Sequence, residues 1–146
     1  MQSGAERKFL IFETLGLFYA FDLVHVSEVS DPLPVWPIPL APPCCIGAIH
    51  LHGSIIAAMD MAAFMGQPQC IKPEKIIVLR KEVAAMSFLV ERVTRIASEQ
   101  EAEILDTPDD VFSSARLIIP EGQVMLMDVF KVLSTAEDMM KLSRIS

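Results

Sequence analysis

Apolar and polar residues alternate in short runs along most of this chain, a pattern typical of β-strands. Glycine and proline interrupt the runs at frequent intervals, which favours short strands joined by tight turns. Gly16 and the pair His52-Gly53 each separate two such runs, so two hairpins are expected. The predicted strands are 9–15, 17–23, 46–51, 54–59, 76–79, 84–90, 93–96, 111–119 and 123–127. About nine short strands with few helices predict an all-β barrel or sandwich.

Two short helices interrupt the strand pattern. Asp60 is a suitable N-cap for a helix over 61–65, and Asp128 for a helix that starts near residue 129 and breaks near Ser134-Thr135. Six prolines between residues 32 and 43 exclude a central strand there, because proline lacks an N–H donor. We expect an extended edge or loop segment, anchored by Trp36.

The segment 99–110 carries six acidic residues and no cation, and it is expected to be a solvated acidic loop. Residues 24–29 show only a broken apolar pattern, so no strand is predicted there.

A length of 146 residues corresponds to about one domain, and an apolar fraction of 52% excludes intrinsic disorder. This apolar fraction fits a well-filled core, and it equally fits surface that is buried against partners. The longest apolar run, 55–65, is interrupted by Asp60 and is shorter than the roughly 20 residues of a spanning helix. Residues 1–8 do not resemble a signal peptide, so we expect a cytoplasmic protein without membrane insertion.

The net charge is −7, and no Lys or Arg occurs between Lys8 and Lys72. A surface that follows nucleic-acid phosphates cannot be built from such a stretch. The sequence therefore argues against nucleic acid as a partner.

Few residues have a pattern that suggests catalysis. Cys44, Cys45 and Cys70 are an odd set, best explained as buried or half-buried thiols without disulfides. His50 and His52 near the two adjacent cysteines could form a zinc-like site, but their spacing matches no usual zinc pattern. We therefore expect no catalytic residue, no metal and no cofactor. A small metal- or thiol-dependent enzyme that uses Cys44, Cys45, His50 and His52 remains the alternative from another class.

The order of the segments resembles the chemotaxis coupling protein (CheW) family. The family's most recognisable stretch is a strand ending I-G-x-x-N-L-R-G, followed by an apolar strand that closes on Asp. Here it reads IGAIHLHG over 46–53, closing on Asp60. The segments that carry the resemblance are 9–29, 37–66, 75–79, 84–96 and 122–133.

The resemblance implies two small five-stranded SH3-like barrels packed together, with short helices and a C-terminal helix. It implies one domain over 8–136, with a soft boundary near 67–73, strand exchange between the halves, and terminal extensions 1–7 and 137–146. It also implies a non-catalytic adaptor that joins the cytoplasmic tips of methyl-accepting chemoreceptors to the regulatory domain of a CheA-type histidine kinase.

The same resemblance suggests partner-binding residues. Val26 and Glu28 fall in the segment that resembles the family's contact region, although a buried valine and a solvated glutamate are equally plausible. Gly47 and Gly53 are expected to allow a close backbone approach and a turn, and so to shape the contact surface. The remaining candidates are His52, Ile76 and Ile77, of which the two isoleucines are also ordinary core residues by sequence.

Four departures from the family pattern leave alternatives open. His50 replaces the usual Asn, His52 the usual Arg, Met61-Ala62 the usual Leu-Arg, and Glu91 the usual Asp. His52 lies at a turn beside Gly53, so we expect it to face a partner. Histidine is shorter than arginine and not permanently charged, so we expect either weaker receptor binding or a receptor that has changed to match. Alternatives are a paralogue serving type IV pili or another non-flagellar pathway, suggested by PLPVWPIP at 32–39, and a decoy that binds only the kinase.

Overall fold

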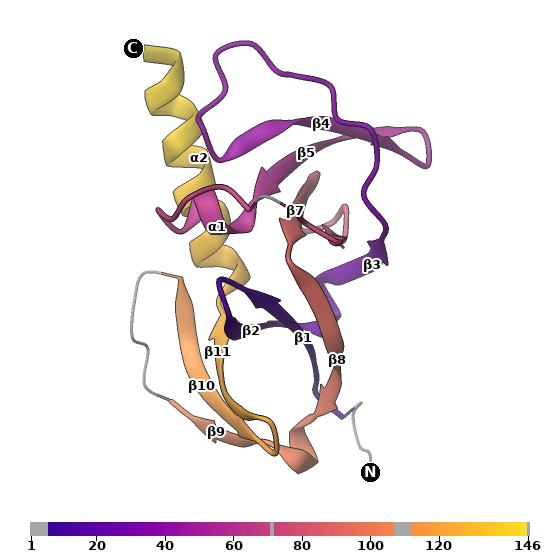
Figure 1. Cartoon of the computed structure of the whole chain (residues 1–146), viewed down its shortest axis with the longest axis vertical. Helices are drawn as coiled ribbons and strands as arrows, with labels where there is room; N and C mark the ends of the chain where they lie inside the picture. Colours follow the sequence, from indigo (N-terminus) through magenta and orange to yellow (C-terminus); the bar gives the residue numbers. More distant parts are fainter. Residues whose placement is uncertain (1–5, 71, 107–111, 146) are drawn as a thin grey trace.

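The computed structural model describes residues 6–70, 72–106 and 112–145. Its strands form two sheets, and the chain visits them in the order first, second, first. The two sheets form the lower and upper halves of the molecule in Figure 1, with the long C-terminal helix beside them. The predicted all-β fold class with two barrel-like halves is confirmed.

The first sheet, called sheet A, has six strands and contains both ends of the strand sequence. Its order is β8 (Arg92–Ser98), β1 (Lys8–Thr14), β2 (Leu17–Asp22), β11 (Gly122–Met127), β10 (Ser113–Ile119) and β9 (Glu103–Leu105). All neighbours pair antiparallel except β11 and β2, which run parallel.

The second sheet, sheet B, has five strands from the middle of the chain. Its order is β3 (Val26–Ser30), β6 (Lys75–Leu79), β7 (Met86–Val90), β5 (Ser54–Asp60) and β4 (Cys45–Leu51). The chain enters this sheet from β2 through the short 3₁₀ helix η1 (Leu23–His25) and leaves it from β7 into β8 of sheet A. The segment 67–73 lies between β5 and β6, which both belong to sheet B.

Two α-helices complete the fold. In α1 (Met61–Phe64), the Asp60 carboxylate accepts a hydrogen bond from the Ala63 amide at 2.9 Å, as predicted for an N-cap. In α2 (Val129–Ile145), Asp128 accepts from the amide of Phe130 at 3.0 Å, so this predicted cap is also confirmed. Neither described helix is long and apolar enough to cross a bilayer.

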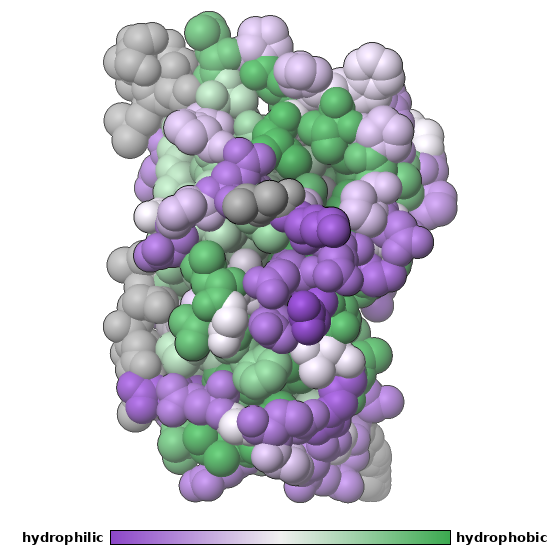
Figure 2. Space-filling model, viewed as in Figure 1, coloured by the Kyte–Doolittle hydropathy of each residue, from purple (hydrophilic) through white to green (hydrophobic). Residues whose placement is uncertain are grey.

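The largest core cluster lies where the two sheets and the helices meet. It contains Phe12 and Phe21 from sheet A, Phe88 from sheet B, Phe64 from α1 and Val132 from α2, all fully or almost fully buried. Two smaller clusters fill the interiors of sheet A and sheet B separately. Figure 2 shows that apolar side chains also reach the surface, mainly over the upper half of this face.

Three expectations from the sequence were wrong. Residues 26–30 form strand β3, because hydrogen bonding to β6 at the sheet edge stabilises a strand that their own hydrophobic pattern does not predict. The acidic segment is not simply a loop: η2 (Glu99–Glu101) has a capping box from Ser98, and Glu103–Leu105 pairs with β10 as β9. Helix α2 continues through residues 134 and 135, since Ala136 beyond them is buried in the core. Residues 107–110 of the acidic segment and residue 111 of the predicted strand 111–119 lie outside the described residues.

Candidate functional site

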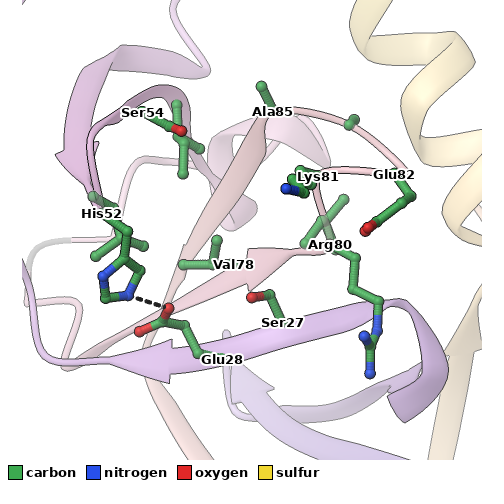
Figure 3. A pocket seen from close by; sticks show the side chains of 13 residues that line it. Ser27, Glu28, His52, Ser54, Val78, Arg80, Lys81, Glu82 and Ala85 are labelled. Atoms are coloured by element: carbon green, nitrogen blue, oxygen red, sulfur yellow. Dashed lines mark hydrogen bonds and ion pairs between the residues drawn. The ribbon is translucent and has the colours of Figure 1, made fainter.

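Glu28 and His52 meet on an exposed part of sheet B, although 24 residues separate them in sequence. The imidazole Nε2 donates a hydrogen bond to Glu28 Oε1 at 2.8 Å. The His52 side chain is 75% exposed and that of Glu28 34%, so a partner can reach both groups. Figure 3 shows the two side chains pointing toward each other from β3 and the β4–β5 turn. The expectation that His52 does not fill the core is confirmed, and its contact with a partner stays a prediction.

The backbone of the β4–β5 turn explains this position. His52 and Gly53 have φ values of 50° and 80°, so both central residues of the two-residue turn are left-handed. Such a turn matches the twist of the strands, and glycine adopts it without strain. Histidine is one of the few other residue types that is enriched in this region. The turn therefore presents the imidazole outward, beside β3.

A cavity of about 400 Å³ lies beside the Glu28–His52 contact. Val78 and Ile56 contribute apolar surface to it, while Ser27, Ser54 and Lys81 contribute polar groups. In Figure 3, Lys81 and Glu82 lie on the side opposite His52 and Glu28. Lys81 is a lining residue that the sequence does not predict, because a cation in a turn after a strand gives no signal of a cavity.

Three of the sequence-predicted contact residues are buried. Val26 is 6% exposed, and Ile76 and Ile77 are fully buried. In the pairing of β3 with β6, Ile76 lies opposite Ser30 and Ile77 opposite Val29. These residues hold β3, and with it Glu28, in place. Their role as direct partner contacts stays a prediction.

Gly47 permits a close approach within the chain itself. It is buried with φ +148°, and a Cβ placed there would lie 2.7 Å from Val35 Cγ1 and closer still to the Trp36 carbonyl oxygen. Trp36 pairs with Ala48 through two backbone hydrogen bonds of 2.8 Å, which hold the proline-rich segment along the edge of β4. The expected close approach is confirmed, and its partner is this proline-rich segment. Trp36 anchors through its backbone, since its side chain is 60% exposed.

The cysteines and histidines do not assemble into one site. Cys44 and Cys45 are buried in the core cluster between the sheets, whereas His50 is exposed and its ring meets Trp36 edge-on at 6.4 Å. Burial raises the pKa of the Cys44 and Cys45 thiols, which makes their reactive thiolate forms scarce. Among the described residues, no three His, Cys, Asp or Glu side chains are placed to hold a metal ion.

The chain is a two-sheet β-domain with Glu28 and His52 in contact on an accessible part of sheet B. The profile of the CheW-like domain matches residues 8–137, and the chain belongs to this family. It is 26% identical over 105 residues to "Chemotaxis protein CheW" of Rhizobium meliloti (strain 1021), covering 70% of this chain and 68% of that protein. It is also 26% identical over 135 residues to "Chemotaxis protein CheW" of Thermotoga maritima, covering 88% of each.

A solved structure shares the fold. The crystal structure of the scaffolding protein TtCheW from Thermoanaerobacter tengcongensis superposes with a TM-score of 0.73 at 20% identity. The superposition covers 85% of this chain and 90% of that protein.

Proposed function

We propose that this protein is a non-catalytic adaptor of bacterial chemotaxis, which couples chemoreceptors to a CheA-type histidine kinase in the cytoplasm. The observation that carries the proposal is the CheW-like match over residues 8–137, nearly the whole chain. A relative at 88% mutual coverage bears the name of a chemotaxis protein, which adds support.

The surface around Glu28 and His52 is the contact region in this proposal. Both side chains are accessible, and the hydrogen bond between them holds the β4–β5 turn against β3. Gly53 gives the turn its geometry, and Gly47 lets the proline-rich segment cover the edge of β4. Val26 and Ile77 are buried in the core cluster where the sheets meet, and Ile76 is buried in the cluster of sheet B, so the three residues anchor β3 and β6.

The test is reconstitution with the kinase and a receptor fragment from the same genome. In the proposal, the protein binds each one at about micromolar dissociation constants, and kinase phosphorylation by ATP rises when all three are combined. Glu28→Ala removes a partly exposed side chain and is expected to lower the affinity for the kinase or for the receptor fragment by about five- to tenfold. Glu137→Ala, at an exposed position of α2, is the control. Binding to neither partner would contradict the adaptor role.

The proline-rich segment 32–39 keeps one alternative in view, an adaptor of a type IV pilus pathway. The segment lies along the β4 edge and exposes Trp36, so a pathway-specific partner can reach it. Parallel titrations with kinases from flagellar and pilus gene clusters of the same organism distinguish the two pathways.

A further inference from the structure

Three large side chains form a row on the outer side of sheet B. Trp36 pairs with Ala48 at the edge of β4, and His50 on β4 lies opposite Ile55 on β5. Paired residues, and residues two apart on one strand, point to the same side of a sheet. The side chains of Trp36, His50 and Ile55 therefore share one side, and this surface is called the Trp36 face. Strands β4 and β5 lie in the upper part of the molecule in Figure 1, away from sheet A.

The Trp36 face is open to solvent. Trp36 is 60% and Ile55 65% exposed, and His50 is exposed between them. The opposite side of the same two strands is packed, since Ile49 and Ile56 are buried in the interior of sheet B. Exposed apolar side chains that gather on one surface are typical of a site where another protein binds.

The charge distribution restricts what covers this face. Residues 32–59 supply all of it and contain no Asp, Glu, Lys or Arg, although the chain has a net charge of −7. His50 adds a ring without a permanent charge. A partner that binds through charge gains nothing here, so the occupant has to bring an uncharged apolar surface of its own.

A second copy of this chain brings such a surface. Two molecules with a net charge of −7 repel each other over most of their surfaces, and a contact between residues 32–59 of both copies opposes no charged side chains of this stretch. Other exposed apolar side chains do not meet this condition: Ile96 follows Arg95, and Phe130 precedes Lys131. A contact between the same face on both copies is the two-fold arrangement of most homodimers.

We propose that the Trp36 face is the contact surface of a symmetric dimer, in which it binds the same face of a second copy. The apolar side chains involved are few, so the interface is smaller than that of a stable dimer and the dissociation constant is about 100 µM. The two-fold axis makes each side chain contribute twice. The dimer does not depend on the adaptor role proposed above, because it needs neither the receptor nor the kinase.

The intrinsic fluorescence of the protein tests the dimer directly, because Trp36 is the only tryptophan in the chain. Between about 10 µM and 1 mM protein, its emission is expected to move to shorter wavelength while sedimentation equilibrium shows conversion from monomer to dimer. Raising NaCl from about 20 to 300 mM screens the repulsion between the two acidic chains, so the dimer should become about threefold tighter. A dimer that weakens with salt would be held by ion pairs at another surface, which overturns the proposal.

Two substitutions on different segments remove the contact. Trp36→Ser is expected to weaken the dimer at least tenfold, and Ile55→Thr about tenfold, since each change acts twice in a symmetric contact. The matched controls are Phe130→Ser and Ile96→Thr, which change side chains that are 64% and 50% exposed outside residues 32–59. Both controls should leave the dissociation constant within twofold of wild type. All four positions are exposed, so the melting temperatures should change by less than about 3 °C, which thermal unfolding checks.

Three results overturn the proposal. The first is a protein that remains monomeric up to about 1 mM, and the second is a dimer that the control substitutions weaken as much as Trp36→Ser does. The third concerns the kinase regulatory domain, the other candidate occupant of the face. If the emission of Trp36 shifts only when this domain is added, the face binds the kinase and not a second copy.

Discussion

The β1–β2 and β4–β5 hairpins turn the chain with nearly the same backbone but use the first turn residue differently. Leu15-Gly16 and His52-Gly53 both have left-handed φ values at the two central positions. His52 has an intramolecular partner, Glu28, which also ties its turn to β3. Leu15 is 42% exposed and lines a cavity together with residues from the connection between β5 and β6. The backbone conformation of a turn therefore does not show what its first residue does. That role depends on which residues the rest of the fold places beside the turn.

The largest expected effect lies in the β4–β5 hairpin, at the strand residue that the proline-rich segment covers. Gly47→Ala forces a Cβ against the Trp36 backbone, so it should destabilise the fold by about 3 kcal/mol and lower the melting temperature by roughly 10 °C. Gly53→Ala is the matched control, because nothing lies within 4 Å of its added Cβ and only the left-handed backbone is strained, at a cost of about 1 kcal/mol. Urea unfolding measures both. Equal losses would mean that the proline-rich segment does not press on Gly47.

His52→Arg tests whether the β4–β5 turn faces a partner. Since His52 is 75% exposed, the melting temperature should change by less than about 2 °C. A permanently charged, fork-shaped donor should strengthen binding to a receptor-tip fragment by about tenfold, because a charge-assisted hydrogen bond contributes roughly 1.5–3 kcal/mol. Thermal unfolding and calorimetric titration provide the two measurements. A loss of several degrees would instead show that the imidazole packs inside the fold.

His52→Asn sharpens the comparison with Leu15. Asparagine relieves strain in a left-handed turn but is too short to preserve the 2.8 Å contact with Glu28. The gain in backbone conformation and the loss of an exposed contact worth less than about 1 kcal/mol should nearly cancel. The melting temperature is expected to stay within about 1 °C of wild type, in contrast to Leu15→Asn, for which the relieved strain should raise it by about 2–4 °C. Differential scanning calorimetry of both variants decides; a similar rise in the two would mean that Glu28 contributes nothing to the turn.

The β10–β11 hairpin supplies an effect that depends on pH. Arg95 Nη2 donates to Glu121 Oε1 in its turn at 2.8 Å, and this guanidinium lowers the pKa of Glu121 from 4.5 to about 2. The contribution of this pair to stability is therefore present above pH 4.5 and is lost as the pH falls toward 2. Glu121→Gln should flatten the stability curve in that interval and change the melting temperature by less than about 2 °C at pH 7, because the pair is exposed. If the Glu121→Gln variant lost stability between pH 4.5 and 2 as steeply as the wild type, the pKa of Glu121 would not differ between the folded and unfolded states.

The sequence predicted most strands, both α-helix N-caps and the two hairpins at Gly16 and His52-Gly53, because these depend on a few neighbouring residues. Alternation along 9–15, 46–51 and 76–79 is sufficient to identify a strand whatever its partner is. Asp60 caps α1 through the amide of Ala63, three residues away, so spacing alone predicts the contact. The family resemblance in turn predicted a domain made of two β halves, which the two sheets confirm.

Only the tertiary structure decided which distant residues meet. Residues 26–30 and 103–105 become strands because an open sheet edge supplies their hydrogen bonds, and no local pattern announces such an edge. The hydrogen bond between Glu28 and His52 and the lack of space for a Cβ at Gly47 also depend on how the segments pack together. The same holds for the buried Thr14 hydroxyl, which has no hydrogen-bond partner among the described residues. The periodicity of a sequence indicates which face of a segment is buried. Which residues pack against that face is determined only when the chain folds.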